Sequence, residues 1–339
     1  MLVQIFVKRL LIAVPTLIGV SLFAFVLIRL APGDPVLTLL GERGGDPKVY
    51  QQMKQTLGLD RHPIEQYFLF VKNAIVGDFG RSISDNNKPV LSEFFKLFPA
   101  TVELGVVGML IATIVGLPLG IAAAIWRRKF WDYFLMGGAL VGYSMPIFWW
   151  GLILIIVFSV HLGWTPVSGR MNALYEVNSV TGFMLIDSWF GDDGLATFFE
   201  ALRHIALPAV ALATVPMAAI ARMTRSSIIE VLREDYIRTA KAKGVSQYPL
   251  VLKHALKNAL IPIVTVLGLM FGTILTGAIL TETIFSWPGI GKWMVKSVQA
   301  RDYPVIQGGV VLIAIMVILV NMIVDMIYVI VNPQLRGAK

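Results

Sequence analysis

The sequence predicts an all-α integral membrane protein with six transmembrane helices. Of its 339 residues, 56% are hydrophobic and 15% are charged, whereas about 25% are charged in typical soluble domains. The mean hydropathy is +0.74, and several apolar runs approach or exceed the roughly 18 residues that mark a spanning helix. A chain of this composition has too little polar surface to cover a water-soluble globule.

The composition also narrows the classes of site and partner. There is no Cys, which excludes disulfides and Cys-ligated metals. The net charge of +8 could favour nucleic acid, but most of the bases lie beside the apolar runs. Positive-inside orientation explains bases in such places, so we expect no nucleic-acid partner.

The first apolar run, from Leu10 to Ile28, follows two bases at Lys8 and Arg9. A cleaved signal peptide is the alternative, but the run is long for one and no A-x-A cleavage site follows it. We therefore predict a retained first helix within residues 1–30. Residues 31–99 are polar and are predicted to form a periplasmic loop, since long loops translocate largely regardless of their charge.

Five further apolar segments complete the six spans within a membrane core at 100–335. These spans are predicted at 101–126, 134–160, 205–221, 260–281 and 308–331. Pro146 removes a backbone donor and should kink the third span. The fourth span is short and is interrupted by Pro208 and Pro216, so we expect other helices to surround it.

The distribution of Lys and Arg predicts the orientation. Segments 1–9, 127–133, 222–258 and 332–339 hold two, three, eight and two bases, fifteen in all, whereas the two shorter loops on the other side hold five. Because bases near the spans concentrate on the cytoplasmic side, we expect both termini in the cytoplasm.

Few polar residues fall within or beside the spans. Asn321 and Asp325 are four residues apart in the sixth span and share a helix face, so they are candidates for a translocation path or for an interhelical hydrogen bond. Glu103 is predicted to complement the N-terminus of the second span, with a role in substrate contact as the alternative. Glu282, just beyond the fifth span, is predicted to be solvated.

Catalytic and nucleotide-binding motifs are not found in the sequence. There is no H-E-x-x-H pair, no G-x-S-x-G elbow and no complete phosphate loop. The chain is therefore not expected to be an enzyme or to hold a cofactor or metal, and any ATP hydrolysis that drives it would belong to another chain.

The polar segment 222–259 separates the fourth and fifth spans. Ser226 to Lys243 is predicted to form one helix, with Ile228, Leu232, Tyr236 and Ala240 on its apolar face. Gly244 should end this helix as a C-terminal capping glycine, and Ser246 can cap a second helix. From composition alone, a basic amphipathic connector bound to anionic lipid is the alternative.

This segment resembles the cytoplasmic loop of ABC importer permeases of the peptide/nickel branch. The matching residues are EDYIRTAKAKG followed by HALKNALIP. The general pattern of the superfamily is Glu-Ala-Ala, three residues and Gly. Ala240 and Gly244 keep that spacing, whereas Arg238 and Thr239 replace Glu-Ala.

The resemblance extends over nearly the whole chain. It includes the motifs PGDP, YSMPIFWWG, ETIFSWPGIG, RDYPVIQGG and NPQLR. The insert that contains TPVSGR and TGFMLIDSWFGDDG resembles that of dipeptide members of this branch.

The resemblance implies the fold of type I, MetI-like importer permeases and a function in dipeptide or short-peptide import across the bacterial inner membrane. It implies a homologous second permease subunit, two ATP-binding subunits that hold ATP and Mg, and a periplasmic solute-binding protein. It also implies that residues of the polar segment couple the chain to the ATPase. These residues are Glu234, Asp235, Tyr236, Arg238, Thr239, Ala240, Lys243 and Gly244.

Other functions are kept as alternatives. A secondary transporter driven by an ion gradient would need coupling carboxylates near the middle of the membrane, and Asp325 is the candidate. Importer permeases for oligopeptides, nickel or haem share the same family. An intramembrane enzyme would need a nucleophile and a base on facing helices, and no such pair is visible in the sequence.

Overall fold

The computed structural model describes residues 2–30, 34–40, 46–56, 58–191 and 193–331. These residues form helices and loops, and their only β-type pairing is an isolated antiparallel bridge between Arg81 and Pro89. The chain divides into two compact units, one of residues 1–98 and 289–322 and the other of residues 99–288 and 323–339. Helices α5 and α14 each contribute to both units.

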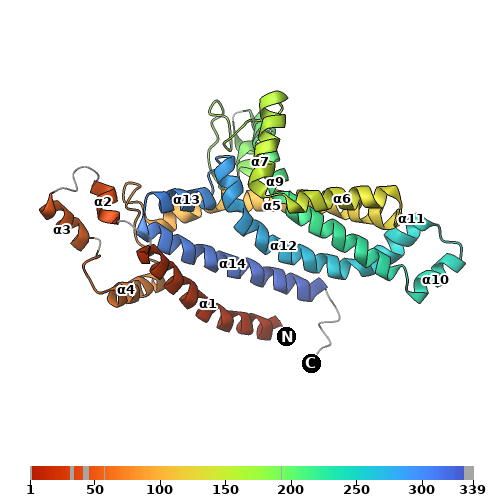
Figure 1. The fold of residues 1–339 in the computed structure, drawn as a ribbon, viewed down its shortest axis with the longest axis horizontal. Helices are drawn as coiled ribbons and strands as arrows, with labels where there is room; N and C mark the ends of the chain where they lie inside the picture. The colour runs from red at the N-terminus through yellow and green to blue at the C-terminus, as the bar shows by residue number, and fades with distance from the viewer. Residues whose placement is uncertain (1, 31–33, 41–45, 57, 192, 332–339) are drawn as a thin grey trace. The chain divides into compact units, whose positions relative to one another are not determined.

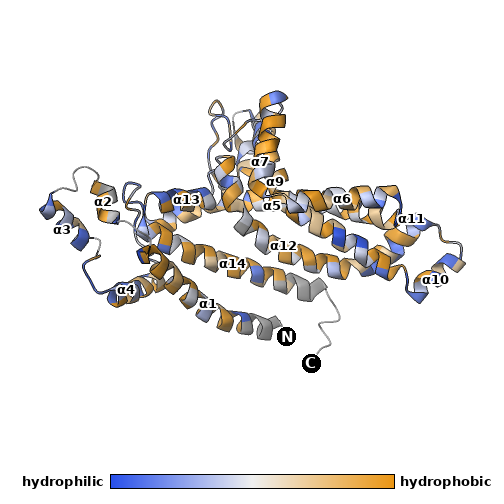
Figure 2. Ribbon diagram, in the orientation of Figure 1, coloured by the Kyte–Doolittle hydropathy of each residue, from blue (hydrophilic) through white to orange (hydrophobic). Residues whose placement is uncertain are grey.

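Unit 1 combines helices from the two ends of the chain (Figure 1). Its elements are α1 (Leu2–Leu30), α2 (Pro35–Leu40), α3 (Pro47–Thr56), α4 (Pro63–Ile75), the start of α5 (Val90–Ile125), α13 (Ile290–Gln299) and most of α14 (Tyr303–Val331). Its core contains the fully buried Val90, Phe94 and Val305. Figure 2 shows α3 as mostly hydrophilic and α14 as mostly hydrophobic.

Unit 2 holds the remaining helices. They are the rest of α5, α6 (Phe130–Ser144), α7 (Ile147–Leu154), the π-helix η2 (Ile155–His161), α8 (Met184–Asp187), the 3-10 helix η3 (Ser188–Phe190), α9 (Gly194–Val231), α10 (Asp235–Ala242), α11 (Gln247–Pro249), the π-helix η4 (Leu250–Ala255) and α12 (Leu256–Ile284).

Helix α9 is the central helix of unit 2. It packs against α12, α6 and α7. In its most apolar 18-residue stretch, 78% is buried, compared with 17–33% in the corresponding stretches of the other long apolar helices. Prediction and structure differ in its length, because α9 has 38 residues and contains Pro208 and Pro216 without a break. Both prolines are buried, so packing around them holds the helix together despite the missing N–H groups.

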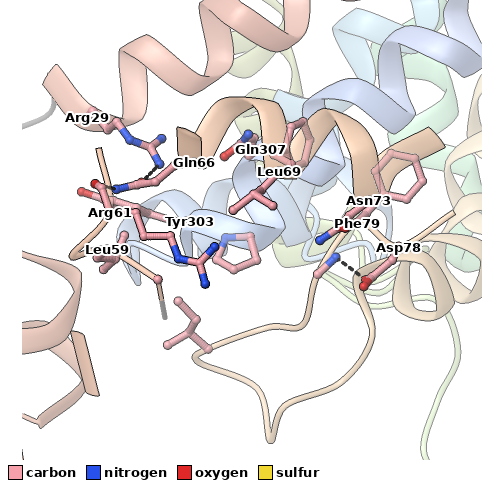
Figure 3. A pocket seen from close by; sticks show the side chains of 15 residues that line it. Arg29, Leu59, Arg61, Gln66, Leu69, Asn73, Asp78, Phe79, Tyr303 and Gln307 are labelled. Atoms are coloured by element: carbon pink, nitrogen blue, oxygen red, sulfur yellow. Dashed lines mark hydrogen bonds between the residues drawn. The ribbon is translucent and has the colours of Figure 1, made fainter. Parts of the chain in front are cut away.

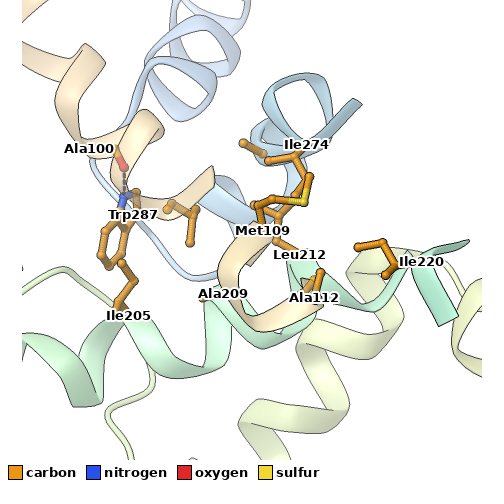
Figure 4. Close-up of a cluster of buried hydrophobic side chains, with 12 residues drawn as sticks. Ala100, Met109, Ala112, Ile205, Ala209, Leu212, Ile220, Ile274 and Trp287 are labelled. Carbon is orange, nitrogen blue, oxygen red and sulfur yellow. Dashed lines mark hydrogen bonds between the residues drawn. The ribbon is translucent and has the colours of Figure 1, made fainter. Parts of the chain in front are cut away.

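Close helix packing explains a glycine pair in α5. A Cβ at Gly116 would lie 2.7 Å from the Met217 carbonyl oxygen, and one at Gly120 would lie 2.5 Å from the Ala221 carbonyl oxygen. These two glycines therefore allow α5 to contact α9 backbone to backbone. The main core of unit 2, drawn in Figure 4, lies farther along the same two helices and includes Leu104 and Leu212.

Five helices in the described part of the chain are long and apolar enough to cross a membrane. The number is six if α6 and the continuous helix formed by α7 and η2 count together as one bent span. That pair bends by 106° at Met145 and Pro146, where the sequence predicts a kink. In Figure 1, α7 rises away from the direction of α6. The second span also differs from its predicted bounds, because α5 begins at Val90, whose side chain is fully buried.

Candidate coupling site

The polar segment between α9 and α12 folds as two separate helices, so the continuous helix predicted from Ser226 to Lys243 is wrong. Helix α9 ends at Val231, a turn follows, and α10 begins at Asp235. Glu234 is extended at the N-cap position, and the Asp235 carboxylate in the first turn favours a helix start. The break changes which side chain is buried, because Ile237 is inaccessible whereas Tyr236 is 42% exposed.

Gly244 ends α10 as predicted. Its φ is +86°, a left-handed conformation that glycine adopts without steric cost. The Gly244 N–H donates to the Lys241 carbonyl at 2.9 Å, and the Val245 N–H donates to the Ala240 carbonyl at 3.2 Å. These two bonds form a complete Schellman motif, which fixes the direction of the chain after the helix. Ser246 occupies the next N-cap, but its side chain makes no capping hydrogen bond.

One apolar side chain anchors α10 to the rest of unit 2. Ile237 packs in a small core with Leu250 and Ala255, and Ala240 and Val245 are partly buried against it. Tyr236 adds a polar contact between α10 and α12, because its hydroxyl accepts a hydrogen bond from Asn258 Nδ2 at 2.6 Å. Leu250 and Ala255 are the ends of the π-helix η4, a geometry that is frequent at functional sites.

Most of the residues predicted to couple the chain to an ATPase share the exposed surface of α10. Ala240 is half-buried and the others are exposed, namely Glu234, Asp235, Tyr236, Arg238, Thr239, Lys243 and Gly244. The Arg238 guanidinium pairs with Asp235 at 3.2 Å, and both side chains are largely solvated. Such a pair costs little to rearrange. Helix α10 is therefore a short helix that is held by the buried Ile237 and exposes polar side chains to solvent.

An ion pair with a buried carboxylate fixes the short basic turn 127–133 to α9. Asp132 is 2% exposed and accepts two hydrogen bonds from Arg225, from Nε at 2.6 Å and from Nη2 at 2.7 Å. The Arg128 N–H donates to the same carboxylate at 2.9 Å. Bidentate pairs of this kind are directional, so the start of α6 and the end of α9 are held in one orientation.

Two glutamates that were predicted to lie at a helix N-terminus and in solvent are buried instead. Glu282 was predicted to be solvated, which is wrong, because it lies inside α12 with no exposed surface and accepts a 2.6 Å hydrogen bond from Thr101. Glu103 does not complement a helix N-terminus, because α5 begins at Val90. Its carboxylate pairs with Arg170 at 2.5 Å and accepts from the Leu185 N–H at 2.7 Å.

The segment between η2 and α9 is held by this pair and by a second carboxylate. Arg170 also donates to the Gly182 carbonyl at 2.7 Å and lies over the ring of the buried Trp287. Burial alone would raise the pKa of Asp187, but hydrogen bonds from the Thr181 hydroxyl and from the Thr181 and Gly182 N–H groups hold that pKa below its ordinary value. No spacing pattern in the sequence predicts the Glu103–Arg170 pair, because the two residues are 67 positions apart in the chain.

The candidates for a translocation path both lie in α14. Asn321 is exposed, and the side chain of Asp325 lies outside the described residues. Their assignment therefore stays a prediction. Among the described residues, no group of three or more His, Asp or Glu side chains could hold a metal ion.

Comparison with known proteins identifies the family. Residues 116–337 match the model of the binding-protein-dependent transport system inner membrane component, and residues 1–105 match the model of the N-terminal part of such membrane components. The chain belongs to this family. The importer permease resemblance seen in the sequence motifs is thereby confirmed.

Curated relatives of this inner membrane component align over almost its entire length. It is 53% identical to the di/tripeptide transport system permease protein DppB of Pseudomonas aeruginosa, with 98% of each chain covered. It is 50% identical to the dipeptide transport system permease protein DppB of Escherichia coli K12, with both chains fully covered. The identity to the Haemophilus influenzae dipeptide permease protein DppB is 52%, over 97% of this chain and 98% of that protein.

Solved structures support the fold. The MetNI methionine ABC transporter in inward-facing conformations has a chain that superimposes with a TM-score of 0.52 at 17% identity, covering 69% of this chain and 93% of that one. A second crystal form gives a TM-score of 0.53 at 18% identity. This likeness, with the family match, shows the predicted MetI-like fold of an importer permease.

Proposed function

We propose that this inner membrane component is a translocation subunit of an ATP-driven importer for dipeptides or short peptides. The substrate class rests on the relatives that are 50–53% identical over nearly full length and carry dipeptide names. The subunit works with a homologous second permease, two ATP-binding subunits that hold ATP and Mg, and a periplasmic solute-binding protein. It spans the bacterial inner membrane with both termini in the cytoplasm.

The observation that carries the coupling role is the structure of α10. It is a two-turn helix between the long apolar helices α9 and α12, anchored by the buried Ile237 and polar on its outer surface. A helix of this kind can enter a groove on an ATP-binding subunit while its anchor transmits movement to α9 and α12. Asp235, Arg238 and Thr239 are the groups on its exposed surface that we assign to that contact.

The mechanism follows from the rigidity of the anchor. The small core around Ile237, against which Val231 and Leu232 pack, holds α10 to the end of α9, and the Asp132–Arg225 ion pair holds the turn 127–133 to the same end. Closure of two ATP-binding subunits would move α10 and, through the π-helix η4 that packs on it, shift α12 and α9. Chemistry on ATP stays in the partner subunits, and the residues of this chain transmit motion.

The experiment is peptide uptake by right-side-out membrane vesicles, or by proteoliposomes with ATP enclosed, that contain the complete transporter. Gly244→Pro cannot adopt φ +86° and loses the N–H that bonds Lys241, so we expect uptake to be abolished while full-length protein remains in the membrane. Gly77→Pro is the matched control, because Gly77 also has φ +86° and its N–H bonds Ala74 at the end of α4. We expect this variant to keep ATP-dependent uptake.

Two results would contradict the proposal. One is normal uptake by Gly244→Pro. The other is uptake by the wild type that persists when ATP is depleted and the proton gradient is intact, since a gradient-driven transporter would behave in that way.

A further inference from the structure

Unit 1 contains a cavity of about 220 Å³ that the transport function does not explain. It lies at the end of α1, between α4 and the start of α14. Figure 3 shows Arg29, Arg61, Gln66 and Tyr303 toward one side of the cavity and Asp78 toward the other. Leu59, Leu69 and Phe79 supply apolar walls.

Arg29 brings an unpaired positive charge to this cavity. Its guanidinium donates to the Gln66 side-chain oxygen and, at 3.2 Å, to the Phe25 carbonyl, and it lies over the Phe25 ring. All three partners are neutral, and no carboxylate within the described part of the chain lies within ion-pair distance. An arginine held in this way keeps donors that match the oxygens of a phosphate or carboxylate.

A second donor in the cavity wall has no acceptor. Gln307 is 6% exposed, and its Nε2 has no hydrogen-bond partner among the described residues. A buried donor without a partner costs about 1–3 kcal/mol, so such groups in native proteins usually serve a bound water or ligand. Gln307 lines the same cavity as Arg29, which places both donors around one space.

The other charged groups leave the cavity with a positive balance. Arg61 is half-exposed and has only a weak contact with Glu65 at 3.5 Å. Asp78 is the single acid in the wall, and its Oδ1 already accepts a hydrogen bond from the Gly80 N–H at 2.9 Å. A neighbouring hollow shares Arg29 and Arg61 and adds one base and one acid, Lys54 and Asp34. The balance therefore stays positive over both.

The position of the cavity relative to the membrane follows from α1. Arg29 lies in the last turn of the apolar span Arg9–Leu30, so its guanidinium lies at the depth of the lipid headgroups. Helix α4 reinforces this placement. Ile64, Phe68 and Ile75 share one face and are 61%, 67% and 80% exposed, which is typical of a helix lying in the membrane interface.

The opposite face of α4 supplies the cavity wall, through Gln66, Leu69 and Asn73. An amphipathic helix thus separates acyl chains on one side from a positively charged cavity on the other. We propose that this cavity binds the phosphate of an anionic membrane phospholipid, with Arg29, Arg61 and Gln307 Nε2 as donors.

Native mass spectrometry of the complete transporter, purified in detergent, tests this site with three probes. These are phosphatidylglycerol, a diacylglycerol with the same acyl chains and no phosphate, and inorganic phosphate. Loss of one charge-assisted contact is worth about a tenfold change in affinity. We therefore expect Arg29→Gln and Arg61→Gln each to retain phosphatidylglycerol about tenfold more weakly than the wild type.

Arg81→Gln is the matched control, because Arg81 is exposed in the same unit, bonds only the Asn87 carbonyl among the described residues, and does not line the cavity. It should retain the lipid as the wild type does. Arg61→Gln keeps the test valid if Arg29→Gln fails to fold, because Arg61 is half-exposed at the surface.

Three outcomes would overturn the assignment. If both cavity variants retained phosphatidylglycerol as strongly as the wild type, the two arginines would not be part of the binding site. Equal retention of diacylglycerol would show an apolar groove that does not recognise phosphate. Displacement of phosphatidylglycerol by an equal concentration of inorganic phosphate would show a site for a free anion.

Discussion

Glu103 and Arg170 form an ion pair whose side chains are only 4% and 13% exposed. Burying two charges has a large desolvation cost, which their mutual attraction offsets only when the geometry is good and the remaining polar atoms are bonded. Both conditions hold, because Glu103 also accepts from the Leu185 N–H and Arg170 also donates to the Gly182 carbonyl. The pair therefore fixes the insert to α5 as long as both partners are present.

Arg170→Met should destabilise the protein by about 3 kcal/mol, because it leaves the Glu103 carboxylate buried without its cation. Thermal unfolding of the detergent-solubilised protein measures this effect. Lys88→Met is the control, since Lys88 forms an exposed pair with Asp85 and should shift the melting temperature little. A melting temperature for Arg170→Met equal to that of Lys88→Met would disprove the structural role of the buried pair.

Asp187 makes a pH-dependent contribution to the same insert. Its pKa is lower in the folded protein than in the unfolded chain, mainly because the Thr181 hydroxyl and backbone stabilise the charged form against the opposing effect of burial. Its stabilisation is therefore present above the ordinary pKa of about 3.9 and is lost as the pH falls through the lower folded value. Asp187→Asn should lower the melting temperature at about pH 7 and have a smaller effect at about pH 3. A difference that is the same at both pH values would contradict this assignment.

At the scale of elements, α10 depends on one buried side chain. The sequence pattern placed Tyr236 on the apolar face, in register with Ile228, because a spacing of four suggested a continuous helix. The turn after Val231 shifts that register, and Ile237 is buried instead. Tertiary contacts with Leu250 and Ala255 determine that Ile237 is the buried side chain. The local sequence around α10 does not predict these contacts.

Ile237→Ala should loosen α10 from the rest of unit 2, since removing a fully buried isoleucine side chain costs about 2–5 kcal/mol. Hydrogen exchange of the α10 amides measures this local effect, and exchange should become faster there than in α9. Leu252→Ala is the control, because Leu252 is 52% exposed on η4. Unchanged exchange in the Ile237 variant would show that the helix is held by other contacts.

At the scale of the whole molecule, hydropathy predicted the spans because lipid imposes a strong and uniform demand on every spanning segment. The Pro146 kink and the helix end at Gly244 were also visible in the sequence, since each has a local backbone cause. The lengths of α5 and α9 were not, because Val90 and Pro208 depend on partners distant in sequence. The buried positions of Glu103 and Glu282 were hidden for the same reason.

The coupling surface was predicted from sequence motifs of the family, and the structure adds its geometry. Seven of the eight assigned residues are exposed on or beside α10 and Ala240 is half-buried, so the motif marks a surface and the apolar anchor lies between its members. The cavity beside Arg29 had no motif, because its donors come from α1, α14 and the segment before α4. Such a site can be recognised only in the folded structure, where these separate segments come together.

The central claim, that α10 docks on an ATP-binding subunit, is tested most directly by cysteine cross-linking in the assembled transporter. The chain contains no native cysteine, so Lys241→Cys in the last turn of α10 gives a single reactive position. Lys72→Cys is the matched control, in the last turn of the amphipathic α4. We predict that a short thiol-reactive cross-linker joins Lys241→Cys, and not Lys72→Cys, to the ATP-binding subunit. A cross-link from Lys72→Cys with none from Lys241→Cys would contradict the account.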